Sequence, residues 1–285
     1  MAWARRRTMW IAAATGVAAF AACAPDEEGT PAGAQSPPTE PQLVNTVFIE
    51  EMTWTEVRDA IAGGATTVII PTAGTEQNGP HMVTGKHRYI IEAASDRIAR
   101  ELGNALVAPV VTYVPEGNVD PPSGHMRYAG TVTLPNEFFM KLLEYAARSF
   151  RVHGFADIVL IGDSGGNQRG MEEVAALLNG EWGGEGARVH FIGDYYAANG
   201  YREWLAEQGE TDETIGRHAG ITDTSLLLYV APQHIRLDQL APGGGFEGSG
   251  VSGDPTRASA EYGEMGMQLR VDAAVRQIRG AVGGA

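Results

Sequence analysis

The chain has 285 residues, with 21 Lys and Arg against 35 Asp and Glu, so its formal net charge is −14. Its single cysteine excludes a disulfide framework and a cysteine-rich zinc module, and the acidic balance argues against a nucleic-acid partner. With 44% apolar and 20% charged residues, the composition is that of a globular protein that can bury a sizeable core.

Residues 1–22 have the pattern of an export signal. A basic segment at 5–7 precedes the apolar run 9–22, which is too short to span a bilayer. The run ends in Phe-Ala-Ala-Cys23, which resembles a bacterial lipobox, so we predict cleavage before Cys23 and a lipid anchor on it. Ordinary signal-peptide cleavage near Ala22 is the alternative, and the arginines at 6–7 also loosely resemble a twin-arginine signal.

Residues 23–43 are rich in proline and acidic side chains and have no apolar periodicity, which predicts a disordered tether. A folded domain is then expected over residues 44–285. The predicted location is the bacterial periplasm or cell envelope, with the membrane contacted only through the anchor at Cys23.

The rest of the chain alternates strand-like and helix-like segments. Apolar, β-branched runs of strand length occur at 66–71, 105–111, 157–162 and 187–193. Amphipathic segments occur at 53–62, 88–102, 135–153, 168–182, 197–208 and 257–282. This alternation predicts an α/β domain with a mostly parallel sheet covered on both faces. Ligands bind beyond the carboxyl ends of such strands, so the following loops are the places to look for chemistry.

The loop after the first strand, residues 71–87, holds Glu76, His81 and His87 in one turn-rich segment. Carboxylate and imidazole groups together are typical of a metal site. The alternative is that Glu76 caps the next helix and the two histidines face solvent.

The loop after the third strand reads Gly-Asp163-Ser164-Gly-Gly-Asn, a G-x-S-x-G pattern between a strand and a helix. It favours either Ser164 as a nucleophile or a turn whose amides bind an anion or a substrate carbonyl. A metal-free serine hydrolase would use Ser164 with His218 as base and Asp194 or Asp223 as the orienting acid.

Five ordered blocks of this sequence resemble the creatininase family of metal-dependent amidohydrolases. They are G-T-E-Q-N-G-P-H at 74–81, H-M-R-Y-A-G-T at 125–131, G-G-N at 165–167, H-A-G-I-T-D-T-S at 218–225 and G-V-S-G-D-P-T-R-A-S-A-E-Y-G at 250–263. The resemblance implies a three-layer α/β/α sandwich, a homo-oligomer that is often a hexamer, and a divalent metal site at the carboxyl ends of the strands. It also implies that His218 delivers a proton to the leaving nitrogen and that Asp223 assists it.

The chain departs from the family pattern at three ligand positions. Asn78 replaces a histidine, His87 replaces the carboxylate that bridges two metals, and Ser164 replaces a second histidine. A neutral imidazole offers one lone pair to one metal, so His87 argues against a dinuclear centre. We therefore predict one zinc, manganese or iron ion per chain.

The predicted ligands of that ion are Glu76, His87 and Asp163. A displaced site that uses His81 or His125, and a protein with no metal, stay open. Asn78, His81, Ser164 and His125 are the predicted substrate-binding residues.

The predicted function is hydrolysis of a small, non-peptide and cyclic amide by metal-activated water in an exported protein. The other alternative is a lipoprotein that binds a small ligand without turnover, because three family ligands are replaced.

Overall fold

The computed structural model describes residues 45–240 and 248–283. The export signal, Cys23 and the tether lie outside the described residues. No helix within the described part of the chain is both long enough and apolar enough to cross a membrane.

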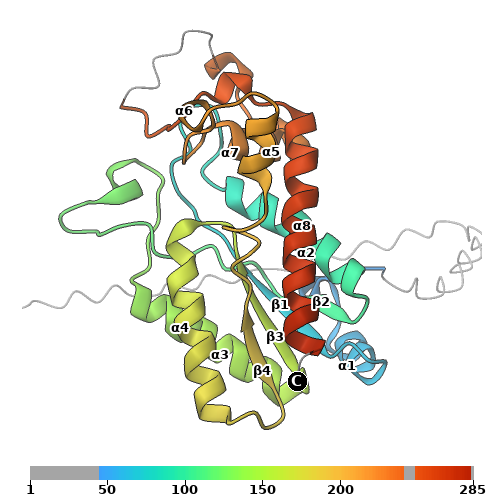
Figure 1. The fold of residues 1–285 in the computed structure, drawn as a ribbon. Coiled ribbons are helices and arrows are strands. Elements are labelled where there is room, and N and C mark those ends of the chain that lie inside the picture. The colour runs from blue at the N-terminus through green and yellow to red at the C-terminus, as the bar shows by residue number, and fades with distance from the viewer. Residues whose placement is uncertain (1–44, 241–247, 284–285) are drawn as a thin grey trace, which may run out of the picture. The chain divides into compact units, whose positions relative to one another are not determined.

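Four parallel strands form the central sheet, in the order β2, β1, β3, β4 (Figure 1). Their bounds are Thr67–Thr72 for β1, Ala105–Val107 for β2, Asp157–Gly162 for β3 and Arg188–Phe191 for β4. The sheet register places Ile69 opposite both Val107 and Val159. The predicted α/β class and the parallel sheet are confirmed.

The sheet is buried on both faces because successive side chains of a strand point to opposite sides. Val68 and Ile70 of β1 pack into one core with α3 (Asn136–His153) and α4 (Gln168–Trp182). Ile69 packs into the other core with α2 (Lys86–Leu102) and α8 (Ala260–Gly283). Helices therefore cover both faces of the sheet, as Figure 1 shows.

Local signals in the sequence set several helix ends. Thr53 and Glu56 form a capping box at the start of α1 (Trp54–Ala62), in which each side chain bonds the other residue's backbone N–H. Gly103 ends α2 and Gly154 ends α3 with φ of 78° and 103°. Glycine adopts this left-handed conformation without a steric penalty, so both helices stop where the sequence predicts.

Three differences from the predicted elements concern the site. Helix α2 begins at Lys86 rather than at 88, which puts Lys86 and His87 in its first turn. Strand β2 is shorter than the predicted run 105–111, because Pro109 has no N–H to give to the ladder. The apolar run 226–230 belongs to a helix, α7 (Ile221–Val230).

The remaining helices, α5 (Tyr201–Glu207) and α6 (Asp212–Ile215), lie in the connection between β4 and α7. The predicted helix 197–208 is shorter because Gly200 at its N-terminal boundary is left-handed, with φ of 83°.

Candidate metal and substrate site

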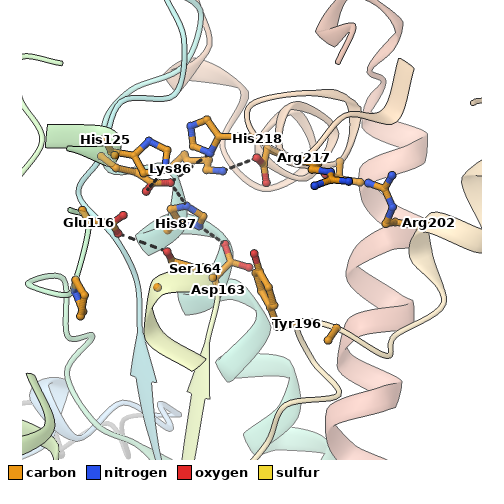
Figure 2. A pocket seen from close by; sticks show the side chains of 18 of the residues that line it. Lys86, His87, Glu116, His125, Asp163, Ser164, Tyr196, Arg202, Arg217 and His218 are labelled. Carbon is orange, nitrogen blue, oxygen red and sulfur yellow. Dashed lines mark hydrogen bonds and ion pairs between the residues drawn. The ribbon is translucent and has the colours of Figure 1, made fainter. Parts of the chain in front are cut away.

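A cavity of about 900 Å³ opens at the carboxyl ends of the strands, where the sheet topology predicts it. Glu76 reaches it from the loop after β1, Asp163 and Ser164 from the loop after β3, and His218 from the segment before α7. Figure 2 shows Asp163, Ser164 and His218 converging from segments that are far apart in the sequence. With His87, His125 and Asp223, which also line it, the fold brings seven predicted site residues into one cavity.

His87 lies between two buried carboxylates on the floor of this site. Its Nε2 donates to Glu76 Oε1 at 2.7 Å, and its Nδ1 donates to Asp163 Oδ2 at 2.8 Å. Burial and the charge of Lys86 disfavour the imidazolium form, but the two carboxylates outweigh them and raise the pKa of His87. Burial would raise the pKa of Glu76, yet the charge and hydrogen bond of His87 hold it below its ordinary value.

Asp163 is itself anchored by two more buried groups. Arg270 NH1 donates to its Oδ1 at 2.6 Å and the Tyr195 hydroxyl donates to the same oxygen at 3.0 Å. Both ring nitrogens of His87 and both oxygens of Asp163 are thus hydrogen-bonded within the protein. The side chains are therefore linked by hydrogen bonds in the order Glu76, His87, Asp163. Their assignment as the ligands of a metal ion stays a prediction.

A second arrangement of residues has the geometry of a metal site. Among the described residues, the ligand atoms of Glu76, His125 and His218 all lie within 4.8 Å of one another. The Glu76 oxygens lie 3.4 Å from His125 Nε2 and 3.6 Å from His218 Nδ1. Ligands about 2.1 Å from one zinc ion in a tetrahedron stand about 3.4 Å apart, so these atoms have the spacing of a shared cation.

The surroundings of His218 suit a metal ligand. Its Nε2 donates to the backbone oxygen of Gln77 at 2.8 Å, which leaves the lone pair on Nδ1, the atom that faces Glu76. Burial and the nearby charge of Lys86 lower the pKa of His218 to about 4. The imidazole is therefore neutral at pH 7, which is the form that binds a metal.

His125 completes this arrangement from the long loop between β2 and α3. Its ring lies 4.4 Å from the ring of His218, centroid to centroid, and its Nδ1 lies 3.1 Å from Gln77 Nε2. Gln77 therefore contacts both histidines, one through its backbone and the other through its side chain. The residues present fit one cation.

The same residues do not fit a pair of metals. His87 has no free ring nitrogen, and Asn78 Nδ2 donates to the Glu76 backbone oxygen at 2.9 Å. Ser164 Oγ donates to Glu116 Oε1 at 3.4 Å. The three replaced family positions are thus engaged with protein partners.

The other predicted site residues divide into two groups. Asp223 lines the cavity, where its Oδ2 accepts from Ala219 N at 2.7 Å and lies 2.7 Å from Lys86 Nζ. Asn78 is buried beside a second, smaller cavity of about 370 Å³. His81 is fully buried, with its Nε2 at 3.0 Å from Thr224 Oγ1, and does not line the main cavity.

The serine-hydrolase alternative lacks its central contact. Ser164 pairs with Glu116, and the two nitrogens of His218 face Gln77 and Glu76. No hydrogen bond joins Ser164 to His218 in the part of the chain that the structure describes. A nucleophile and its base need such a contact.

Sequence reasoning did not single out Lys86 or Arg270 as site residues, although both line the cavity together with Glu116. Burial and the neighbouring Glu76 raise the pKa of Glu116 to about 10, so its carboxyl is protonated at neutral pH. The sequence indicates Glu116 through its place in the turn-rich loop 115–122 after the second predicted strand, where its carboxyl can shape the mouth of the substrate site. Nothing in the sequence distinguishes Lys86 or Arg270 from an ordinary exposed cation.

Comparison with known proteins decides the family. A family model described as creatinine amidohydrolase matches residues 50–278, most of the chain. The chain belongs to the creatininase family. It is therefore a hydrolase of a family that acts on amide bonds.

Curated relatives of this creatininase-family protein have different activities. It is 27% identical over 238 residues to the mycofactocin precursor peptide peptidase of Mycobacterium tuberculosis. The aligned region covers 74% of this chain and 84% of that peptidase. It is 26% identical over 203 residues to the creatinine amidohydrolase of Pseudomonas putida, covering 70% and 77%.

A crystal structure of creatinine amidohydrolase has the same fold. The match has a TM-score of 0.70 at 23% identity and covers 83% of this chain and 98% of the other. Similar creatininase structures include manganese and zinc forms. In this chain, Glu76, His125 and His218 are the group of described residues whose ligand atoms are close enough together to hold a metal ion.

Proposed function

We propose that this protein is an exported hydrolase that uses one divalent metal ion to cleave the C–N bond of a small, non-peptide amide. The observation that carries the proposal is the convergence of Glu76, His125 and His218 in the main cavity of a creatininase-family fold. We assign His218 to the metal rather than to proton delivery, because its Nε2 donates to the Gln77 backbone.

The reaction consumes one water molecule. The water oxygen bonds to the carbonyl carbon, the C–N bond breaks, and the nitrogen takes a proton, so that a carboxylic acid and an amine result. A bound divalent ion would supply a more acidic water and polarise the carbonyl oxygen. The protein's part is to fix the ligands: Gln77 holds both imidazoles, and His87 holds Glu76.

The size of the cavity supports a small substrate. About 900 Å³ lies within the range of sites that hold small molecules and cofactors. Creatinine amidohydrolase among the relatives favours a cyclic amide. Ser164 and Glu116 line the cavity and offer hydrogen-bonding groups to such a substrate.

Hydrolysis assays test this function. The full chain, loaded in turn with zinc, manganese or iron, is given cyclic amides including creatinine and, in parallel, short peptides. Turnover of a cyclic amide that is lost in Glu76→Ala supports the proposal. Turnover of peptides alone would place the protein with its peptidase relatives instead.

A non-catalytic ligand-binding protein is the second candidate, and one observation favours it. The buried carboxylates Glu76, Asp163 and Asp223 are each paired with a cation of the protein itself, contributed by His87, Arg270 and Lys86. The fold can therefore balance these charges without a metal. A chain that binds no metal and turns over no amide under any loading would fit this candidate.

We also propose that the protein is exported and anchored through Cys23. The supporting pattern is the basic and apolar segment that ends in Phe-Ala-Ala-Cys23. Cell fractionation and palmitate labelling of the wild type and of Cys23→Ala test the anchor. Labelling that persists in the variant would contradict it.

A homo-oligomer, with a hexamer as the family expectation, is supported by the outer face of α3. Phe138, Leu142, Tyr145 and Val152 lie on one face of this helix and are between 39% and 83% exposed. An apolar stripe of this kind is typical of a protein interface. Light scattering on the wild type and on Phe138→Lys/Tyr145→Lys tests the oligomer, and a monomeric wild type would contradict it.

A further inference from the structure

Lys86 is a fully buried cation inside the site. It is the first residue of α2 and has no exposed surface, yet it lines the main cavity. Its charge acts on Glu76 and on His218, the two triad members contributed by the loops after β1 and before α7. In Figure 2 its side chain is drawn close to His125 and His218.

The ammonium group of Lys86 has more donors than partners. Its Nζ forms an ion pair with Asp223 Oδ2 at 2.7 Å. Apart from this ion pair, no acceptor across the described ranges 45–240 and 248–283 forms a hydrogen bond with this nitrogen. An ammonium carries three N–H bonds, so at least two of them lack an acceptor, and buried donors without acceptors are costly.

If Lys86 served only to pair with Asp223, its remaining N–H bonds would be buried without acceptors. Asp223 already accepts from the Ala219 backbone through the same Oδ2 that faces Lys86. The other cations that line the cavity are differently placed: Arg270 is bonded to Asp163, Arg202 is bonded to Asp212, and Arg217 is exposed. Among the described residues, Lys86 Nζ and Arg270 Nε are the buried cationic nitrogens that line the cavity without a hydrogen-bond partner, and Lys86 is the one whose charge acts on both Glu76 and His218.

We propose that Lys86 is a catalytic residue whose ammonium group binds the carbonyl oxygen of the substrate and stabilises the oxyanion that forms on it. This inference rests on the proposed amide hydrolysis. When the water oxygen bonds to the carbonyl carbon, the π electron pair moves onto the carbonyl oxygen, and the free N–H bonds of Lys86 contact the resulting charge. The pair returns when the C–N bond breaks and the nitrogen leaves with a proton.

This assignment gives the chain a positive charge where it lacks the ligands for a second metal. A buried donor aimed at a developing oxyanion is effective because it needs no reorganisation during the reaction. Asp223 is then a positioning residue. It lies in α7, and its ion pair with Lys86 holds the ammonium group at the edge of the cavity.

The test measures binding of methylphosphonate, a small tetrahedral oxyanion, to the zinc-loaded full chain by calorimetry. The variants are Lys86→Met, Asp223→Asn, the double variant Lys86→Met/Asp223→Asn and Arg217→Gln. The double variant leaves no unpaired buried carboxylate at Asp223, so it guards against a single variant that fails to fold. Arg217→Gln is the matched control, because it removes an exposed cation from the same cavity.

We expect both variants without Lys86 to bind methylphosphonate at least about tenfold more weakly, with unchanged zinc content, while Arg217→Gln retains the affinity. Asp223→Asn keeps the ammonium but loosens its position, so its loss of affinity should be smaller than that of Lys86→Met. On an amide substrate, the loss of Lys86 should lower kcat by about 100-fold with a smaller change in KM. A wild type that does not bind methylphosphonate, or a loss in Asp223→Asn or Arg217→Gln equal to that in Lys86→Met, would overturn the assignment.

Failure of the proposed function is distinguishable from failure of this inference. If the wild type holds no zinc, the metal site is refuted. The methylphosphonate titration of the metal-free chain, with the same four variants, still reports whether Lys86 is the oxyanion donor.

Discussion

His87 Nε2 lies 2.7 Å from Glu76 Oε1, so the second residue of helix α2 donates a hydrogen bond to a buried carboxylate of the site. The second nitrogen of the same ring binds Asp163. The imidazole of His87 thus joins two buried carboxylates from different loops.

The His87 bridge predicts a large loss of stability on its removal. His87→Gln would leave two buried carboxylates without their shared cation, and breaking a buried pair of this kind costs about 3–5 kcal/mol. Urea unfolding monitored by circular dichroism measures the difference from the wild type.

The matched control is His190→Gln. His190 Nε2 pairs with Asp157 Oδ1 at 2.8 Å, but these side chains are 10% and 17% exposed, against 5% and 1% for His87 and Asp163. A pair that water reaches more easily contributes less, so His190→Gln should lose less stability than His87→Gln. Equal losses in the two variants would contradict the bridging role of His87.

The ion pair between Glu210 and Arg257 predicts a pH-dependent contribution to stability. Hydrogen bonds from Arg257 lower the pKa of Glu210, outweighing its burial. Because the folded-state pKa lies below the ordinary value, this stabilisation is present at neutral pH and is lost as pH falls through the folded-state pKa.

Thermal unfolding of Glu210→Gln measures this effect. We expect its Tm to lie below that of the wild type at pH 7 and the gap to narrow toward pH 3. A gap that stays constant or widens on acidification would show that Glu210 does not act through its charge.

Two glycines of α8 predict opposite effects of the same substitution. A Cβ on Gly263 would lie 1.9 Å from the Ser225 backbone oxygen in α7, whereas a Cβ on Gly280 would meet no atom within 4 Å. Gly263→Ala should therefore destabilise the fold by about 1–3 kcal/mol through overpacking. Gly280→Ala should stabilise it by about 0.5–1 kcal/mol, since alanine favours a helix over glycine. Chemical unfolding of both variants checks the pair, and changes of the same sign would argue against the close contact of α7 with α8.

The strands and most helices could be predicted because their patterns are local. Ile69 and Val68 lie in a β-branched run of strand length, and Thr53 with Glu56 marks the start of α1. Helix α7 was not predicted as a helix because its run is apolar on every side and shows no helical periodicity.

The residue types of the site could be predicted from the sequence, but the contacts between these residues could not. Glu76, His125 and His218 were all indicated by family-like motifs, but they come from three loops whose approach depends on the whole fold. The prediction of His87 as a ligand rested on its position in the chain. Its two hydrogen bonds to carboxylates depend on Asp163, 76 residues away, and no local pattern reveals them.

Metal content measured together with ligand variants tests the central claim most directly. The full chain and the variants His125→Ala, His218→Ala and His81→Ala are loaded with zinc, passed through a desalting column and analysed by mass spectrometry. We predict one zinc per wild-type chain, retention in His81→Ala, and loss in both His125→Ala and His218→Ala. A wild type without zinc, or one that keeps it in both of those variants, would contradict a single metal held by Glu76, His125 and His218.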